Sequence, residues 1–173
     1  MQKGFATLEI IFAVMIIAVL MTCAIPNAVR MIDRAALDYE TKRLYSELHF
    51  LQAVNRVERV NNKGTGQNFA PTVYPVMKIS TENFSYQILR GDVPLREAHQ
   101  MHNIKTIEFN GNVSEKITFN DAGQATTYNP NPAVRGTALS GRITLTSRLD
   151  KPSAIFFDSV GRIHVEYGRR NNE

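Results

Sequence analysis

The stretch MQKGFATLEIIFAVMIIAVLMTCAIP, from Met1 to Pro26, decides the architecture of this chain. It holds a nearly unbroken apolar run, and about 20 apolar residues are enough for one helix to cross a bilayer. The run contains a single acid, Glu9. An unpaired carboxylate in the middle of a bilayer costs about 3 kcal/mol on insertion scales. We therefore expect Glu9 to have a partner and a function.

A short stub, Met1-Gln2-Lys3-Gly4, precedes the apolar run. A cut after Gly4 would create a new amino group at Phe5, close to Glu9. Along one straight helix these two groups lie about 6 Å apart, so pairing is better between two staggered, packed helices. Glu9 of one subunit is thus expected to pair with the Phe5 amine of a neighbour, because either charge alone in hydrocarbon is the costlier state.

The start Gly4-Phe5-x-x-x-Glu9, the apolar run behind it and Pro26 resemble the amino-terminal signature of type IV pilins and pseudopilins. The order Ala6-Thr7-Leu8 departs from the commoner one but leaves the cut and the acid in place. The resemblance implies that a prepilin peptidase of the inner membrane removes residues 1–4 and methylates the Phe5 amine. It also implies that residues 5–26 remain as a transmembrane and assembly helix, with other pilins and an inner-membrane assembly platform as partners.

Three other interpretations of the same segment stay open. A secretory signal would be cut behind small residues after the apolar stretch, for which Thr22-Cys23-Ala24 is a loose candidate. Leu20-Met21-Thr22-Cys23 partly resembles the signal of lipoproteins, in which the cysteine is acylated, but Thr22 stands where that signal has Gly, Ala or Ser. A plain single-span anchor is the third. None of these three interpretations gives Glu9 a role.

Composition limits the remainder to one domain. The chain has 173 residues, a net charge of +4 and an isoelectric point near 9.3, so it is mildly basic and does not have the strongly basic, clustered charge of a dedicated nucleic-acid binder. Its single cysteine, Cys23, lies in the membrane segment, so the exported part is held by packing without an internal disulfide. Many major pilins have a carboxy-terminal disulfide loop, and its absence favours a minor pilin or pseudopilin.

The helical pattern continues behind Pro26, which should kink the helix. Residues 27–60 are predicted as its amphipathic half, ending near Val60 before the loop Asn61–Gly66. Apolar residues recur there at three- and four-residue steps: Leu37, Leu44, Leu48, Leu51 and Val54. Charged residues lie between them: Asp33, Arg34, Asp38, Lys42, Arg43 and Glu47. We expect this charged flank to be a solvated face, with a docking surface as the alternative.

Residues 61–173 are predicted as a β-rich head, because β-branched and aromatic residues gather in short stretches between turn residues. The predicted strands are Thr72–Ile79, Phe84–Leu89, Lys105–Asn110, Lys116–Asn120, Arg142–Ser147, Ala154–Phe157 and Ile163–Tyr167. Two small antiparallel sheets should pack on the carboxy-terminal half of the helix. The predicted class is α+β, a long kinked membrane-spanning helix on a β-rich head, as in the pilin fold.

The end of the chain is similar to the H-type minor pseudopilins of type II secretion and to the FimT-type minor pilins. This resemblance rests on a series of strands and turns between Ile117 and Ile163 and on the helix end Leu48–Val60. Some FimT-type proteins bind incoming DNA through a G-R-x-R motif. Gly161-Arg162-Ile163-His164 matches its first three positions and has His164 in place of the second arginine.

Arg162, together with Arg169 and Arg170, is therefore a candidate for contact with DNA phosphates. Guanidinium groups on strand ends and a tail suit such contact, which does not depend on base sequence. The alternative is that these arginines only keep the surface soluble.

No catalytic, metal or cofactor site emerges from the residue pattern. His99 and His102 have a spacing of possible metal ligands, but no acid or cysteine cluster completes a site. Gly64-Thr65-Gly66 lacks the remaining features of a nucleotide-binding loop.

We predict a non-enzymatic minor pilin or pseudopilin, held in the bacterial inner membrane and then assembled with its head in the periplasm or outside the cell. The alternatives are a minor pilin that binds DNA during uptake, and a single-span membrane-anchored binding domain.

Overall fold

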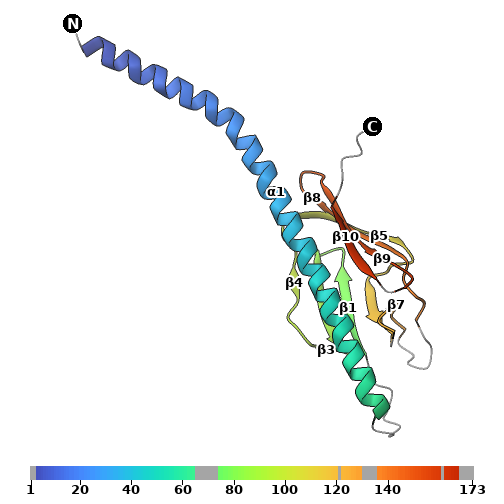
Figure 1. Cartoon of the computed structure of the whole chain (residues 1–173). Coiled ribbons are helices and arrows are strands. Elements are labelled where there is room, and N and C mark those ends of the chain that lie inside the picture. The colour runs from blue at the N-terminus through green and yellow to red at the C-terminus, as the bar shows by residue number, and fades with distance from the viewer. Residues whose placement is uncertain (1–2, 65–73, 121, 130–135, 161, 168–173) are drawn as a thin grey trace.

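The computed structural model describes residues 3–64, 74–120, 122–129, 136–160 and 162–167, and side chains in these ranges except those of residues 3–7, 23 and 58–64. Figure 1 shows one long helix whose carboxy-terminal half lies on a group of strands, while its amino-terminal half extends away from them. We call the strand-containing part of the chain, from β1 to β10, the head.

Helix α1 runs from Lys3 to Gly64 and contains Pro26. It bends within its blue part in Figure 1, and an internal proline is a common cause of such a bend because it removes one backbone hydrogen bond. The helix passes the predicted end at Val60. Asn61, Asn62 and Lys63 disfavour a helix only weakly, whereas Gly64 is the first strong breaker, so the helix ends there.

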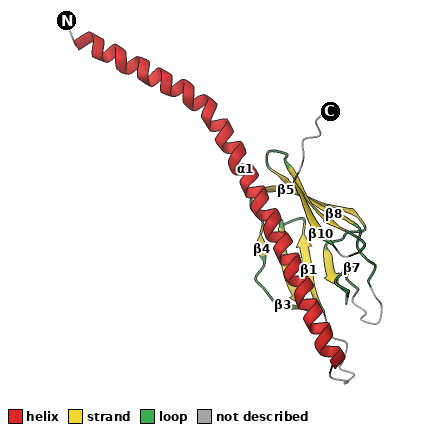
Figure 2. Cartoon of the chain, in the orientation of Figure 1, coloured by secondary structure: helices red, strands yellow, loops and turns green. Residues whose placement is uncertain are grey.

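The head consists of two antiparallel sheets, as predicted (Figure 2). The first has the order β3-β2-β1-β6-β7, with β4 also paired to β2. Its strands are β1 (Pro75–Ser80), β2 (Ser85–Arg90), β3 (Val93–Pro94), β4 (His99–Gln100), β6 (Lys116–Phe119) and β7 (Ala125–Thr127). The second has the order β10-β9-β8-β5. Its strands are β5 (Ile104–Gly111), β8 (Gly141–Ser147), β9 (Pro152–Phe157) and β10 (Ile163–Tyr167).

All seven predicted strands overlap a strand of the structure, whereas β3, β4 and β7 were not predicted. These three have only two or three residues each, which is too short to show an alternating pattern. They exist because a neighbouring strand supplies hydrogen-bond partners, β2 for β3 and β4, and β6 for β7.

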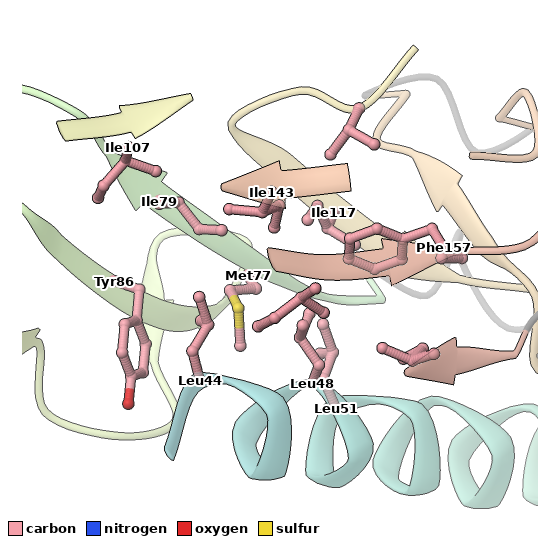
Figure 3. Close-up of a cluster of buried hydrophobic side chains, with 14 of the residues drawn as sticks. Leu44, Leu48, Leu51, Met77, Ile79, Tyr86, Ile107, Ile117, Ile143 and Phe157 are labelled. Atoms are coloured by element: carbon pink, nitrogen blue, oxygen red, sulfur yellow. The ribbon is translucent and has the colours of Figure 1, made fainter. Parts of the chain in front are cut away.

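The core lies between α1 and both sheets. Leu44, Leu48 and Leu51 are fully buried, and Figure 3 shows them pointing from α1 toward Met77 of the first sheet and Ile143 of the second. Leu37 is buried as well, so four of the five predicted apolar positions belong to the core, while Val54 is half-buried. The α+β class and the packing of the sheets on the carboxy-terminal half of the helix are confirmed.

Candidate functional site

The amino-terminal half of α1 has an exposed apolar surface. Its most apolar stretch has a mean hydropathy of 2.7 and contains no buried residue, so the helix is long enough and apolar enough to cross a membrane. Large apolar side chains more than half exposed there include Leu8, Ile10, Ile11, Phe12, Val14, Met15, Ile16, Ile17, Val19, Leu20, Met21 and Ile25. No part of the described head covers them, and exposed apolar surfaces of this size are typical of segments that contact a membrane or another protein.

Glu9 is exposed on this apolar half and makes no ion pair with any described residue. The Gly4–Phe5 junction lies in the first turns of α1, with the side chain of Phe5 outside the described part. Pro26 is exposed farther along the same helix. The predicted processing and assembly residues therefore share the half of α1 that the head leaves free.

One prediction about the charged flank of α1 is wrong. Asp33 is buried, with 4% of its surface exposed, and does not belong to a solvated face. Its Oδ1 accepts a hydrogen bond from Asn103 Nδ2 at 2.6 Å, and its Oδ2 accepts one from Ser147 Oγ at 2.6 Å. Both donors come from the second sheet or the link leading to it, so their hydrogen bonds replace the water that Asp33 loses.

Glu40 is a second buried carboxylate on the same face. Its Oε2 lies 2.8 Å from His99 Nε2, and its Oε1 accepts a hydrogen bond from the backbone N–H of His102 at 3.1 Å. His99 thus joins the head to the helix. Among the described residues, no three or more His, Cys, Asp or Glu side chains gather in a way that could hold a metal ion. We call Asp33 and Glu40 with their partners the helix–head contacts.

The sequence held a signal for these contacts that the prediction did not use. Asp33 and Glu40 are seven residues apart, and Leu37 and Leu44 repeat with the same spacing. Seven residues are close to two helical turns, so all four side chains lie on one stripe of the helix. Acids inside an apolar stripe indicate buried polar contacts.

A cavity of about 350 Å³ lies between α1 and β2. Arg43 and Glu47 of α1, Tyr86 of β2, and Arg96 of the link to β4 contribute to its wall. Arg96 Nη1 is 2.6 Å from Glu47 Oε1. Burial raises the pKa of Tyr86, so its hydroxyl stays protonated at neutral pH. The wall also includes His99 and offers several hydrogen-bonding groups to the cavity.

Of the three predicted DNA contacts, only Arg162 lies in the described part of the chain. Arg162 lies next to Asp158, with Nη2 2.9 Å and Nε 3.2 Å from Asp158 Oδ2. A hydrogen bond from the backbone N–H of Val160, followed by the bond from Arg162, holds the pKa of the Asp158 carboxyl below its usual range. Gly161, Arg169 and Arg170 lie outside the described residues.

His164, the residue in place of the second arginine, is exposed on β10. Its ring stacks on Phe156 at 5.1 Å between centroids and 9° between planes, and its Nε2 is 3.9 Å from Glu166. Arg142 of β8 also lies near the Phe156 ring, with its Cζ 5.9 Å from the centroid of that ring. On this surface, Arg162 and His164 therefore each lie close to an acid, Asp158 and Glu166 respectively.

Comparison of the chain with protein-family models, with curated proteins and with solved structures finds no match in any of the three.

Proposed function

We propose that this chain is a minor pilin or pseudopilin, a non-enzymatic subunit of a type IV pilus or of a type II secretion pseudopilus. In this proposal the inner membrane holds the subunit by residues 5–26 until it enters a filament. Its partners are the prepilin peptidase, the assembly platform and other pilins, and its head faces the periplasm or the outside of the cell.

One observation carries the proposal: a single helix is divided into a half packed by its own head and a half that is apolar, exposed and contains one acid. A soluble protein gains nothing from such a surface, whereas a helix that moves from a bilayer into a bundle of like helices needs it in both places. The bend in α1 separates the two halves, so that the span and the head can take different directions (Figure 1).

Glu9 fits assembly better than anchoring. A plain anchor would be more stable in the bilayer without this carboxylate. In a filament, the free amine of a processed neighbour, at Phe5, would neutralise it, which favours the filament over the dispersed subunit.

Contact with DNA remains a second candidate function, supported by the exposed cation Arg162 at the end of the head. It is the weaker candidate because Asp158 already pairs with that guanidinium. A membrane-anchored binding domain remains the alternative outside the pilin class, supported by the cavity beside Tyr86.

Processing and assembly test the proposal together. Protein isolated from its own membrane should begin at Phe5 and carry a methyl group on its amine, as read by intact-mass analysis. A start at Cys23 or Ile25, or an intact leader in cells with active prepilin peptidase, would remove the pilin interpretation.

Glu9→Leu tests the role of the acid. It should leave membrane insertion unchanged or improved, because it removes a charge that costs about 3 kcal/mol in the bilayer. Incorporation into sheared filaments should fall by roughly tenfold or more, since the pairing with the neighbour's amine is lost. Phe12→Leu, an uncharged change in the same exposed segment, is the matched control and should assemble normally. Equal assembly of both variants contradicts the proposed role of Glu9.

A further inference from the structure

Four cationic side chains gather where α1 leaves the head. Arg30 and Arg34 are exposed, one helical turn apart on one face of α1. Arg148 and Lys151 are exposed in the turn between β8 and β9. None of the four makes an ion pair with a residue that the structure describes.

The nearby acids do not neutralise this group. Asp33 lies between Arg30 and Arg34 in the sequence, but its carboxylate is buried and accepts hydrogen bonds from Asn103 and Ser147. Asp150 in the β8–β9 turn pairs with Lys105 at 2.6 Å. Both acids thus have other partners, and neither is paired with one of the four cations.

The helix and the turn lie side by side. Ser147, the last residue of β8, donates to Asp33 at 2.6 Å and so joins the β8–β9 turn to α1. Figure 1 shows this turn at the end of the head that faces the amino-terminal half of α1. Leu149 lies in the same turn with 42% of its surface exposed.

Arg30 lies at about the depth of the lipid headgroups, and Arg34 lies one helical turn beyond it. Ile25 is the last residue of the apolar run, and at 1.5 Å per residue Arg30 follows about 8 Å and Arg34 about 14 Å farther along the axis. The headgroup layer is about 6 Å thick on each side of the hydrocarbon. Side chains of a helix lean toward its amino terminus, so the long side chains of both arginines extend in the direction of the proposed membrane span.

We propose that Arg30, Arg34, Arg148, Leu149 and Lys151, the cationic rim, dock the head on anionic phospholipid of the leaflet from which α1 emerges. This inference rests on the proposed membrane span of residues 5–26. The four cations contact lipid phosphates, and Leu149 enters the apolar side of the interface. The rim holds the head of the unassembled subunit against the membrane. This contact between the rim and the lipid must break before the subunit enters a filament.

The chain has no tryptophan, so a single Leu149→Trp substitution supplies a reporter that keeps an apolar residue at the turn. The full chain with this reporter is reconstituted into vesicles of phosphatidylcholine alone, or of phosphatidylcholine with phosphatidylglycerol in both leaflets. Emission wavelength and quenching by lipids brominated near the headgroup measure contact of residue 149 with the bilayer.

We expect a shift to shorter wavelength and stronger quenching in the anionic vesicles, both reduced by salt. Arg30→Gln with Arg34→Gln should lower the ratio of docked to free head by roughly tenfold or more, since each cation near an anionic surface contributes about fivefold. Arg148→Gln with Lys151→Gln should do the same. Arg56→Gln, at an exposed arginine of α1 near the far end of the head, is the control and should change nothing.

The outcomes separate the two proposals. Protein that does not float with either kind of vesicle contradicts the membrane span itself. The proposed docking of the cationic rim is overturned if the inserted protein shows the same emission and quenching in both lipids. It is also overturned if Arg56→Gln has the same effect as the two rim variants. Rim variants that keep normal lipid quenching but assemble poorly into filaments also overturn it, and would assign these residues to a neighbouring subunit.

Discussion

At the scale of single residues, the buried carboxylates Asp33 and Glu40 determine how α1 meets the head. Each accepts two hydrogen bonds from the head. The donors to Glu40 are His99 of β4 and the backbone of His102, and the donors to Asp33 are Asn103, just before β5, and Ser147 at the end of β8. Hydrogen bonds to a charged group are stronger than neutral ones, and they are lost completely when the carboxylate is removed. The helix–head contacts thus define one position of the helix along the sheets, which leucine packing alone would define less sharply.

Asp33→Ala should destabilise the head by about 2–4 kcal/mol, because Asn103 and Ser147 lose their acceptor in a buried place. Its unfolding temperature should fall by about 10 °C or more, as followed by circular dichroism of the full chain in detergent. Asp38→Ala removes a carboxylate that is 40% exposed, pairs with Lys42 on the same helix and also interacts with Tyr167 of β10, and it should cost about 1 kcal/mol or less. Equal losses in the two variants would mean that Asp33 is not stabilising the contact.

Asp158 gives a test of the surface near the carboxy terminus. Its carboxyl pKa should lie below the usual range, chiefly through the N–H of Val160 and secondly through Arg162. Because the folded-state pKa is lowered, this stabilisation is present above the unfolded-state pKa and is lost as the pH falls through the folded value. Carbon NMR titration of the carboxyl should show that Arg162→Gln raises the pKa only partly. A complete return to the usual value would make Arg162 the main cause.

At the scale of elements, α1 is one continuous helix with two different environments. Residues from Leu37 to Leu51 pack on both sheets, whereas residues from Leu8 to Ile25 remain exposed. The head therefore depends on the carboxy-terminal half of the helix and not on the amino-terminal half.

Leu48→Ala should destabilise the head by about 3 kcal/mol, because it leaves a cavity beside fully buried neighbours of both sheets. Val57→Ala on the same helix removes a side chain that is 58% exposed, and it should change stability by less than about 0.5 kcal/mol. Urea unfolding of the two variants in the same detergent measures the difference. A small effect of Leu48→Ala would show that α1 is not part of the head's core.

At the scale of the whole molecule, the boundary between membrane and soluble parts falls within one helix. A chain that lacks Met1–Asn27 retains every fully buried side chain of the core, so it should fold and remain soluble without detergent. Size-exclusion chromatography should show a monomer, with the full chain soluble only in detergent as the comparison. Aggregation of the shortened chain would mean that the head needs the removed segment or that Val29, Met31 and Ile32 require a cover.

Periodicity along the chain determined the elements of this protein. The apolar run to Ile25, the stripe of leucines from Leu37 to Leu51 and the seven longer strands are properties of neighbouring residues, which local backbone geometry converts directly into helix or strand. The candidate residues Gly4, Phe5 and Glu9 were available from the same local pattern.

Only the tertiary structure decided which distant residues meet. Glu40 and His99 are 59 positions apart, and Asp33 and Ser147 are 114 positions apart, so no local period relates them. Burial of these acids, the pairing of the shortest strands and the gathering of Arg34 and Arg148 at one end of the head depend on how the sheets pack against α1. Packing selects these contacts because a buried polar group must find its partner wherever the fold supplies one.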